Sequence, residues 1–270
     1  MTATLKHGDK GQPVTDLQNL LNKNGAQLRL DGLYGDATEK AVKAYQANVG
    51  LVADGIAGPK TQARLLGIND GKHLQHSDLV KAAGQLEVSL ASVYAINEVE
   101  SQGQGFLPNG KAKILFERHV FRERLEAAGH DVARLETQYP NLVNATTGGY
   151  SGGTAEWQRL ALARQIDETA ALESASWGAF QIMGYHWQRL GYESVQAFVA
   201  AMSEGEGPQL EAFVRFILAD SALHNALKTR KWAKVAELYN GPTYKRNLYD
   251  IKLARAYERH AAEDLAKEAA

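Results

Sequence analysis

The sequence of 270 residues contains no cysteine. Disulfide frameworks, thiolate metal sites and hydrolases with a cysteine nucleophile are therefore excluded. An excess of charge of one sign is also missing, because 30 Lys and Arg residues oppose 31 Asp and Glu residues. Nucleic acids and anionic membrane surfaces select basic proteins, so we expect neither as the main partner.

Long apolar runs are absent as well. No stretch of about 18 apolar residues occurs, and the N-terminal segment MTATLKHGDKGQP has no apolar region of the signal-peptide type. We therefore expect no stable membrane insertion, synthesis in the cytoplasm without a signal peptide, and a separate release step if the substrate lies outside. The content of 44% hydrophobic residues suffices for a core, and the length allows two unequal domains.

A short internal repeat marks the N-terminal part of the chain. The stretch from Asp31 to Thr38 (DGLYGDAT) matches the stretch from Asp54 to Thr61 (DGIAGPKT). Each copy is typical of a tight turn that leads into a helix, with Pro59 suited to a first helical turn. Apolar residues at helical spacing lie before and between the copies. We predict a three-helix module over 1–67, a linker over 68–76 and a second domain over 77–270.

The second domain carries mostly helical patterns. Pro108-Asn109-Gly110, followed by the apolar run up to Phe116, predicts a small β-hairpin. The expected fold class is mainly α, with a three-helix module and an α-helical domain that contains one hairpin. Beyond the hairpin, helical spacing covers residues 119–129, 155–173, 195–202, 208–221, 231–239 and 245–266.

Glu100 is the most informative acidic residue. It shares a helical stripe with Val93, Ile96 and Asn97, whereas Glu98 points elsewhere. A half-buried carboxyl group has a raised pKa and can keep a proton for a leaving oxygen near neutral pH. The alternative is a solvated glutamate at a helix end.

Two further segments suit a sugar-binding groove. One runs from Ser174 to Gly184 and combines small residues with an aromatic ring and the amide of Gln181. The other, Tyr239-Asn240-Gly241-Pro242, ends a helix with a hydroxyl and an amide. Taken singly, each segment is a weak signal, because an aromatic residue next to glycine is more often part of a core or a turn.

Together these segments resemble the lysozyme-like superfamily, which includes goose-type lysozymes and soluble lytic transglycosylases. Its three signatures are matched in order by Glu100-Ser101, by Ser176-x-Gly178-x-x-Gln181-Ile182-Met183 and by Tyr239-Asn240. The segments Ile114 to His119, Gly148 to Tyr150 and Ala175 to Gly178 are similar to the N-acetylmuramidase domain of modular bacteriophage endolysins. The repeated Asp-Gly-x-x-Gly-x-x-Thr resembles the signature of type 1 peptidoglycan-binding domains.

The resemblance implies a function and a set of site residues. Glu100 is expected to protonate the β-1,4 glycosidic oxygen between N-acetylmuramic acid and N-acetylglucosamine, and the enzyme to lyse a host cell after release through a holin. Ser176, Gln181, Tyr239 and Asn240 are the expected substrate-binding residues. In the module, the residues expected to serve peptidoglycan binding are Asp31, Tyr34, Gly35, Thr38, Asp54, Gly58 and Thr61.

The second catalytic group is less well defined by the sequence. Glycosidases usually pair the acid with a second carboxylate. Glu117, at the end of the predicted hairpin, is our candidate, and its alternative role is an ion pair with Arg118 or Arg122.

Two rival hypotheses remain open at this point, and a third, metal catalysis, has little support in the sequence. A lytic transglycosylase would use the same acid but form an anhydro sugar. A wall-binding or virion protein could keep the fold without catalysis. A zinc amidase would need ligands such as His119, His186 and His224, but the close spacing of common zinc motifs is missing. We expect no metal, no cofactor and a monomeric chain whose partner is peptidoglycan.

Overall fold

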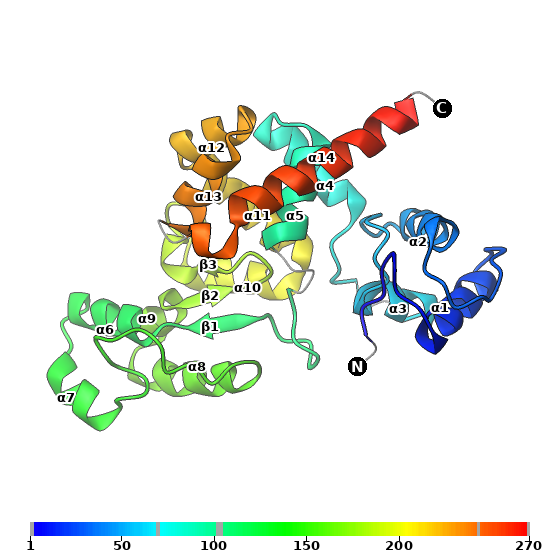
Figure 1. Cartoon of the computed structure of the whole chain (residues 1–270). Helices are drawn as coiled ribbons and strands as arrows, with labels where there is room; N and C mark the ends of the chain where they lie inside the picture. Colours follow the sequence, from blue (N-terminus) through cyan, green and yellow to red (C-terminus); the bar gives the residue numbers. More distant parts are fainter. Residues whose placement is uncertain (1–2, 69–70, 101–104, 242–243, 269–270) are drawn as a thin grey trace. The chain divides into compact units, whose positions relative to one another are not determined.

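Figure 1 shows the computed structural model, which describes residues 3–68, 71–100, 105–241 and 244–268. Linker residues 69–70, Ser101 of the first signature and Pro242 of the third lie outside the described residues. The chain divides into two compact units, Met1–Lys81 and Ala82–Ala270. The division falls inside helix α4, which spans His76–Leu86.

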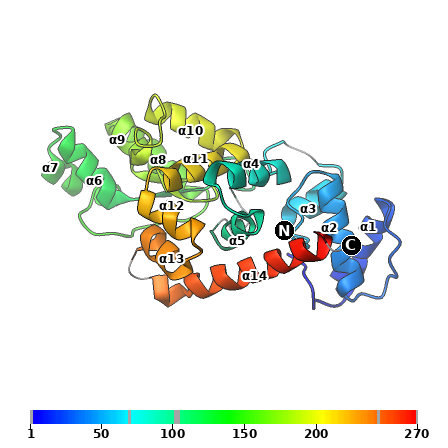
Figure 2. The same cartoon turned by 90° about the horizontal axis from the view of Figure 1, so that it is seen from above.

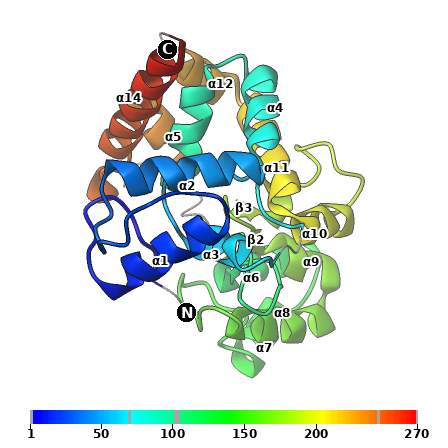
Figure 3. The same ribbon diagram turned by 90° about the vertical axis from the view of Figure 1, so that its right-hand side faces the viewer.

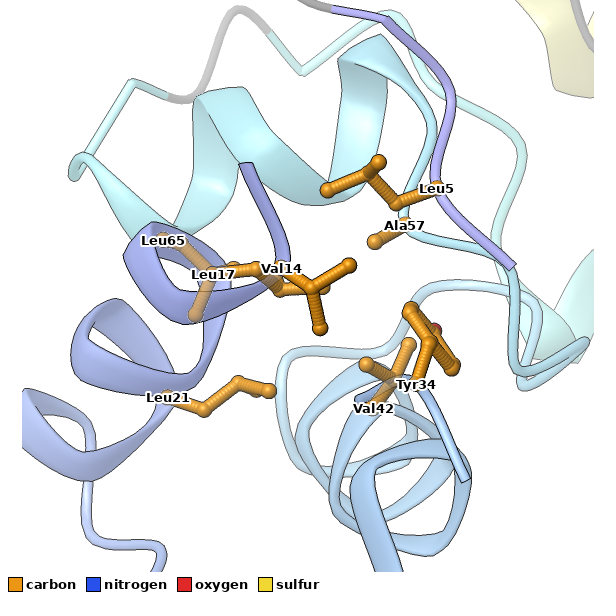
Figure 4. Close-up of a cluster of buried hydrophobic side chains, with 8 residues drawn as sticks. All are labelled: Leu5, Val14, Leu17, Leu21, Tyr34, Val42, Ala57 and Leu65. Atoms are coloured by element: carbon orange, nitrogen blue, oxygen red, sulfur yellow. The ribbon is translucent and has the colours of Figure 1, made fainter. Parts of the chain in front are cut away.

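The N-terminal unit contains the predicted three-helix module. Its helices are α1 (Gln12–Lys23), α2 (Asp36–Asn48) and α3 (Pro59–Leu65). Their apolar stripes meet in one core with side chains from the connecting loops, as Figure 4 shows. The core side chains are Leu5, Val14, Leu17, Leu21, Tyr34, Val42, Ala57 and Leu65. Burying each large one contributes about 1.5–3 kcal/mol.

Both copies of the repeat are held by a glutamine from the preceding helix. In the first copy, the Gln18 side-chain amide donates to Asp31 Oδ1 at 2.9 Å and to Thr38 Oγ1 at 3.1 Å, and Gly32 N donates to Gln18 Oε1. In the second copy, Gln46 donates to Asp54 Oδ1 at 2.8 Å and to Thr61 Oγ1 at 3.0 Å. The loops are therefore built around buried, hydrogen-bonded amides, which satisfies the polar groups that the turns enclose.

The C-terminal unit has a small antiparallel sheet with helices on either side. In Figure 1, α5 and α11–α14 gather on one side of the sheet and α6–α9 on the other, and Figures 2 and 3 show α14 running alongside α5. The elements are α5 (Leu90–Glu100), β1 (Ile114–Phe116), α6 (Arg118–Ala127), α7 (Val132–Gln138), α8 (Ala155–Ile166), α9 (Glu168–Glu173), β2 (Ala175–Trp177), β3 (Ile182–Met183), η1 (Gly184–His186), α10 (Val195–Glu204), α11 (Glu206–Leu218), α12 (Ser221–Lys228), α13 (Trp232–Asn240), η2 (Tyr244–Asn247) and α14 (Tyr249–Glu268). The mainly α fold class with a small hairpin is confirmed.

The strand pairing differs from the predicted hairpin. The turn at Pro108 to Gly110 does form, but it joins only an isolated bridge between Phe106 and Ala112. β1 pairs instead with β2, far along the chain, in the register Ile114↔Trp177, and β2 pairs with β3. The hairpin of the sheet is therefore β2–β3. Sequence reasoning missed it because its strands are short and buried, without alternation.

Several helices end earlier than their periodicity suggested. The pattern over 155–173 is divided at Asp167, whose side chain accepts a hydrogen bond from Ala170 N and begins α9. Asp220 likewise accepts from Leu223 N and begins α12. A carboxylate at a helix N-terminus is stabilised by the free N–H groups there, so each aspartate favours a new helix over continuation. Among the described residues, no helix combines the length and the apolar character needed to cross a membrane.

A buried ion pair stabilises the glycine-rich loop before α8. Glu156, which is 0% exposed, accepts from the backbone N–H groups of Ser151, Gly152 and Phe116. Arg159 Nη1 donates to Glu156 Oε2 at 2.8 Å and also to the carbonyl of Phe116. These backbone hydrogen bonds and the arginine keep the pKa of Glu156 below its usual range despite burial.

Candidate active site

An open cavity of about 420 Å³ lies between the two helical parts of the C-terminal unit. The end of α5, the β2–β3 hairpin, η1, α11, α13 and the start of α14 each contribute side chains to it. Its size is that of a small-ligand site. The lining residues are Glu100, Lys113, Ala179, Phe180, Gln181, Ile182, Met183, Tyr185, His186, Phe216, Tyr239, Asn240 and Tyr249.

Among the described residues that line the cavity, Glu100 is the one carboxylic acid. On its other side it borders an apolar crevice formed by residues such as Ile96, Phe213 and Leu253. Burial raises the pKa of Glu100 to about 7, and the hydrogen bond from Asn240 opposes the shift only in part. The half-buried acid predicted from the helical stripe is thus present. Glu98 points away, as expected, and pairs with Arg259 and with His260.

The third signature lies directly against the acid. Asn240 Nδ2 donates to Glu100 Oε1 at 3.3 Å. The Tyr239 hydroxyl instead donates to the backbone carbonyl of Phe180 at 2.7 Å. Burial raises the pKa of Tyr239 well above its ordinary value, and the nearby charge of Glu100 adds to the effect. Asn240 therefore contacts the acid, and Tyr239 fixes the hairpin opposite to it.

The second signature forms the turn of the β2–β3 hairpin. Ser176 is buried, and its hydroxyl donates to Gln181 Oε1 at 2.9 Å, while Gln181 Nε2 donates to the carbonyl of Gly178 at 2.7 Å. Gln181 has a φ of 50°, a conformation that non-glycine residues rarely adopt and that is typical of functional sites. Gln181 therefore lines the cavity, whereas Ser176 lies beneath it.

Gly178 is required in that turn for steric reasons. Its φ is 74°, and a Cβ atom there would come within 2.5 Å of the Gln209 side chain. Gln209 is buried in α11 and its Oε1 accepts from Ala179 N at 2.8 Å. The glycine thus allows α11 to hold the turn that presents Gln181 to the cavity.

Glu117 lies at the junction of β1 and α6 and is not among the residues that line the cavity. The Tyr150 hydroxyl donates to both of its carboxylate oxygens, at 3.0 Å and 2.9 Å, and His119 Nδ1 lies 3.3 Å from Oε2. Arg118 and Arg122, the alternative partners, bond elsewhere: Arg118 to the carbonyl of Thr146 and Arg122 to other glutamates. Hydrogen bonds from the phenol group of Tyr150 therefore hold the carboxylate of Glu117.

The three histidines of the zinc hypothesis lie apart. His119 is beside Glu117, His186 packs against Phe216, and His224 hydrogen-bonds the carbonyl of Leu86. Among the residues that the structure describes, no group of three or more His, Asp or Glu side chains is close enough to share a metal ion. The histidines thus give a zinc amidase no support.

Sequence reasoning missed four polar groups of the cavity. Lys113, Tyr185, His186 and Tyr249 line it, and burial lowers the pKa of His186 to about 4. Tyr249 carries a raised pKa, first through burial and then through the charge of Glu100. These residues stand outside the three signatures. His186 was considered only as a possible zinc ligand, and no spacing pattern places the four residues at the cavity.

Of the seven module residues, three are buried, whereas Asp31 is exposed and Gly35, Asp54 and Gly58 are partly exposed. Tyr34, Thr38 and Thr61 are only 2 to 3% exposed, and the Tyr34 hydroxyl donates to the carbonyl of Gly55. Asp31 and Asp54 accept from the glutamines described above and from backbone N–H groups. Gly35 and Gly58 are the residues immediately before α2 and α3. The repeat therefore builds the module, and burial limits direct ligand contact at Tyr34, Thr38 and Thr61.

The segment that contains the cavity matches a known protein family. The N-acetylmuramidase family matches residues 89–261, which include the whole cavity lining. The chain belongs to the N-acetylmuramidase family. A peptidoglycan binding domain matches residues 10–65 of the muramidase, and so covers the three-helix module.

A solved structure has the same domain order as this muramidase. The crystal structure of the Burkholderia AP3 phage endolysin is 55% identical, with a TM-score of 0.92, and the match covers 96% of this chain and 100% of the endolysin chain. The muramidase is thus a glycoside hydrolase of the modular endolysin type, with a peptidoglycan-binding module and a lysozyme-like domain.

Curated relatives share only shorter segments with the muramidase. The zinc D-Ala-D-Ala carboxypeptidase of Streptomyces albus G is 42% identical over 72 residues, which are 26% of this chain and 28% of that protein. The N-acetylmuramoyl-L-alanine amidase CwlL of Bacillus licheniformis is 34% identical over 104 residues, 37% of this chain and 28% of that protein. The chain spans little more than a quarter of these relatives, so their chemistries are not carried over.

Proposed function

We propose that Glu100 is the general acid that cleaves the β-1,4 bond between N-acetylmuramic acid and N-acetylglucosamine. The observation that supports this role is a carboxyl group that faces an open cavity and whose pKa is raised to about 7 by burial. At neutral pH about half of such groups carry a proton, which is the state a general acid needs.

The hydrogen bond from Asn240 favours a proton on the other carboxyl oxygen of Glu100. Because Asn240 Nδ2 donates to Oε1, that oxygen acts as an acceptor, and the acidic proton is carried by Oε2. Oε2 then donates to the glycosidic oxygen while the C1–O bond breaks. Asn240 acts on the acid in this scheme, and Gln181 on the sugar. Ser176 and Tyr239 position the hairpin through their hydrogen bonds to Gln181 and Phe180.

Glu117 is the proposed partner for the attacking water. The water gives its proton to the Glu117 carboxylate while its oxygen bonds to C1, which balances the proton lost by Glu100. The hydrogen bond from Tyr150 would hold the carboxylate in one orientation for this step. Glu117 also lies directly after β1, whose neighbour β2 leads into the turn with Gln181.

Product analysis separates hydrolysis from cyclisation. Purified peptidoglycan digested with the enzyme should release muropeptides with reducing N-acetylmuramic acid ends, as seen by mass spectrometry. Muropeptides lighter by one water, with 1,6-anhydro rings, would identify a lytic transglycosylase instead. The rate should not change on addition of a chelator, and a loss that zinc restores would overturn the carboxylate mechanism.

The same proposal includes the biological setting. The chain would be made in the host cytoplasm, reach the wall through a holin, act as a monomer and lyse the cell. The phage endolysin likeness supports this route. Expression without a holin should leave host cells intact, whereas co-expression with a holin should lyse them. Lysis by the enzyme alone would contradict the route.

A further inference from the structure

The module carries a second concave surface that no signature explains. A groove of about 380 Å³ lies between the end of α1, the 24–28 loop and one face of α2. Its twelve lining residues are Leu21, Asn24, Gly25, Ala26, Gln27, Leu28, Ala37, Lys40, Ala41, Ala44, Tyr45 and Asn48. Several polar residues of this groove, such as Asn24, Gln27 and Lys40, are exposed and therefore accessible to a ligand.

The groove wall is prebuilt. Asn22 donates to the carbonyl of Leu28 at 2.8 Å and accepts from Leu28 N at 2.7 Å, which closes the 24–28 loop. Asn24 Nδ2 donates to the carbonyl of Leu65 on α3. Because both sides of the wall are already fixed, little conformational entropy is lost when a ligand binds.

The floor and the rim differ in chemistry. Alanines of α2, such as Ala37, Ala41 and Ala44, make a shallow apolar floor that accepts methyl-sized groups. The rim carries the amides of Gln27 and Asn48 and the exposed ammonium group of Lys40. The lining contains this cation and no acidic residue, so its charge favours an anionic ligand.

Arg64 adds to the positive character near the floor. Its guanidinium lowers the pKa of Tyr45, although burial of that tyrosine has the larger, opposite effect. The buried Nε of Arg64 has no hydrogen-bond partner in the described part of the chain. Arg64 is not among the lining residues, so Lys40 is the cation that the lining presents, and a peptide carboxylate can form a charge-assisted hydrogen bond with it.

We propose that this groove binds the stem peptide of peptidoglycan, with alanine methyl groups on the α2 floor and a peptide carboxylate at Lys40. The proposal rests on the proposed function, since it names which part of peptidoglycan the module takes. The domain would then be anchored through peptides while the lysozyme-like domain cleaves the glycan strand. Anchoring raises the local concentration of glycan at the catalytic cavity.

The test is co-sedimentation of the full chain with purified sacculi, in a Glu100→Gln background that leaves the wall intact. Lys40→Glu and Ala44→Trp, both at exposed positions, should each weaken binding about tenfold or more. Lys10→Glu is the matched control, because Lys10 is an exposed lysine of the same module outside the groove. It should bind like the parent. Circular dichroism of each variant verifies the fold.

Two wall preparations identify the ligand. Sacculi stripped of stem peptides by an amidase should lose the module-dependent part of binding, and the free stem peptides should compete for intact sacculi. A second outcome is that the parent binds stripped sacculi as well as it binds intact sacculi, with Ala44→Trp abolishing that binding. This result would make the groove a glycan site and overturn the peptide assignment. Binding of both groove variants at the level of the control, or no sedimentation of the parent, would overturn the groove itself.

Failure of the groove and failure of the catalytic proposal are distinguishable. Cleavage of soluble, uncrosslinked glycan oligomers needs only the Glu100 cavity. In a Glu100-containing chain, Lys40→Glu should therefore cleave these oligomers like the parent while losing activity on intact sacculi. An inactive parent would contradict the proposed function and leave the sedimentation result valid.

Discussion

Two glutamates of the C-terminal unit are shielded from water, and their carboxyl groups have opposite properties. Glu156 accepts three backbone hydrogen bonds and faces Arg159, so its pKa is lowered. Glu100 has an apolar crevice behind it and one long hydrogen bond, from Asn240, so its pKa rises to about 7. Burial alone therefore does not make an acid catalyst. What distinguishes Glu100 is that its burial is not offset by hydrogen bonds and a charge like those around Glu156.

The same contrast explains the location of each residue. Glu156 stabilises a loop of glycines, and that loop carries Tyr150 to Glu117. Glu100 stands at a helix end on an open cavity, where substrate and proton can meet. The carboxylate of Glu156 is ionised and has a structural role. The carboxyl group of Glu100 is protonated for part of the time, and this makes it reactive.

Substitution of Glu100 should have the largest effect on activity. Glu100→Gln keeps the shape but has no proton to donate, so the loss of turbidity of wall suspensions should slow by about 10² or more. Glu98→Gln, two residues away on the same helix, removes ion pairs with Arg259 and His260 that lie outside the cavity and should stay within about twofold of the parent. Parental activity in Glu100→Gln would refute the assignment.

Substitution of Glu156 should instead act on stability. Glu156→Gln leaves Arg159 buried without its counter-charge, so the free energy of unfolding should fall by about 3–5 kcal/mol. The exposed pair of Arg164 and Glu168 on neighbouring turns offers a control, and Glu168→Gln should cost less than about 1 kcal/mol. Denaturant unfolding measures both. Equal effects would mean that the loop does not depend on the buried pair.

The pH dependence of stability should separate the two glutamates further. A carboxyl group with a raised pKa favours folding below its unfolded pKa of about 4.5, and this contribution is lost as the pH rises through about 7. Glu100→Gln should therefore equal the parent at pH 4 and exceed it by up to about 3 kcal/mol at pH 8. A constant difference across that range would contradict the raised pKa.

Asn240 should tune the acid, with the smallest of these effects. Asn240→Leu removes the donor that favours the ionised carboxyl, so the pKa of Glu100 should rise above its present value of about 7. The alkaline limb of the profile of kcat/KM against pH should move upward by about one unit or less. A downward movement would show that Asn240 opposes the charged form.

Local sequence patterns predicted the helices and turns better than they predicted the contacts between distant parts of the chain. The repeat and its glycines predicted turns and helices correctly because turn chemistry is decided within a few residues. The helical stripe likewise predicted a shielded Glu100. The partners of β1 and of Glu100 lie far along the chain, in β2 and at Asn240, and no spacing within a helix or turn encodes them.

The repeat also shows that one motif can have a structural role besides a predicted binding role. Asp31, Thr38 and their second copies, which we predict to serve ligand binding, also accept hydrogen bonds from Gln18 and Gln46. The glutamines stand outside the repeated stretch, so the signature alone did not reveal the network. Glu156 was missed for a similar reason, since its partners are backbone groups of strand β1 and of the loop before α8.

A direct titration of the two glutamates tests the central claim. The side-chain carboxyl carbons of glutamate can be followed by NMR from pH 3 to 9, with Glu100→Gln and Glu156→Gln providing the assignments. The account predicts a midpoint near 7 for Glu100 and one below 4.5 for Glu156. A midpoint for Glu100 at or below 4.5 would contradict the claim that burial makes it the proton donor.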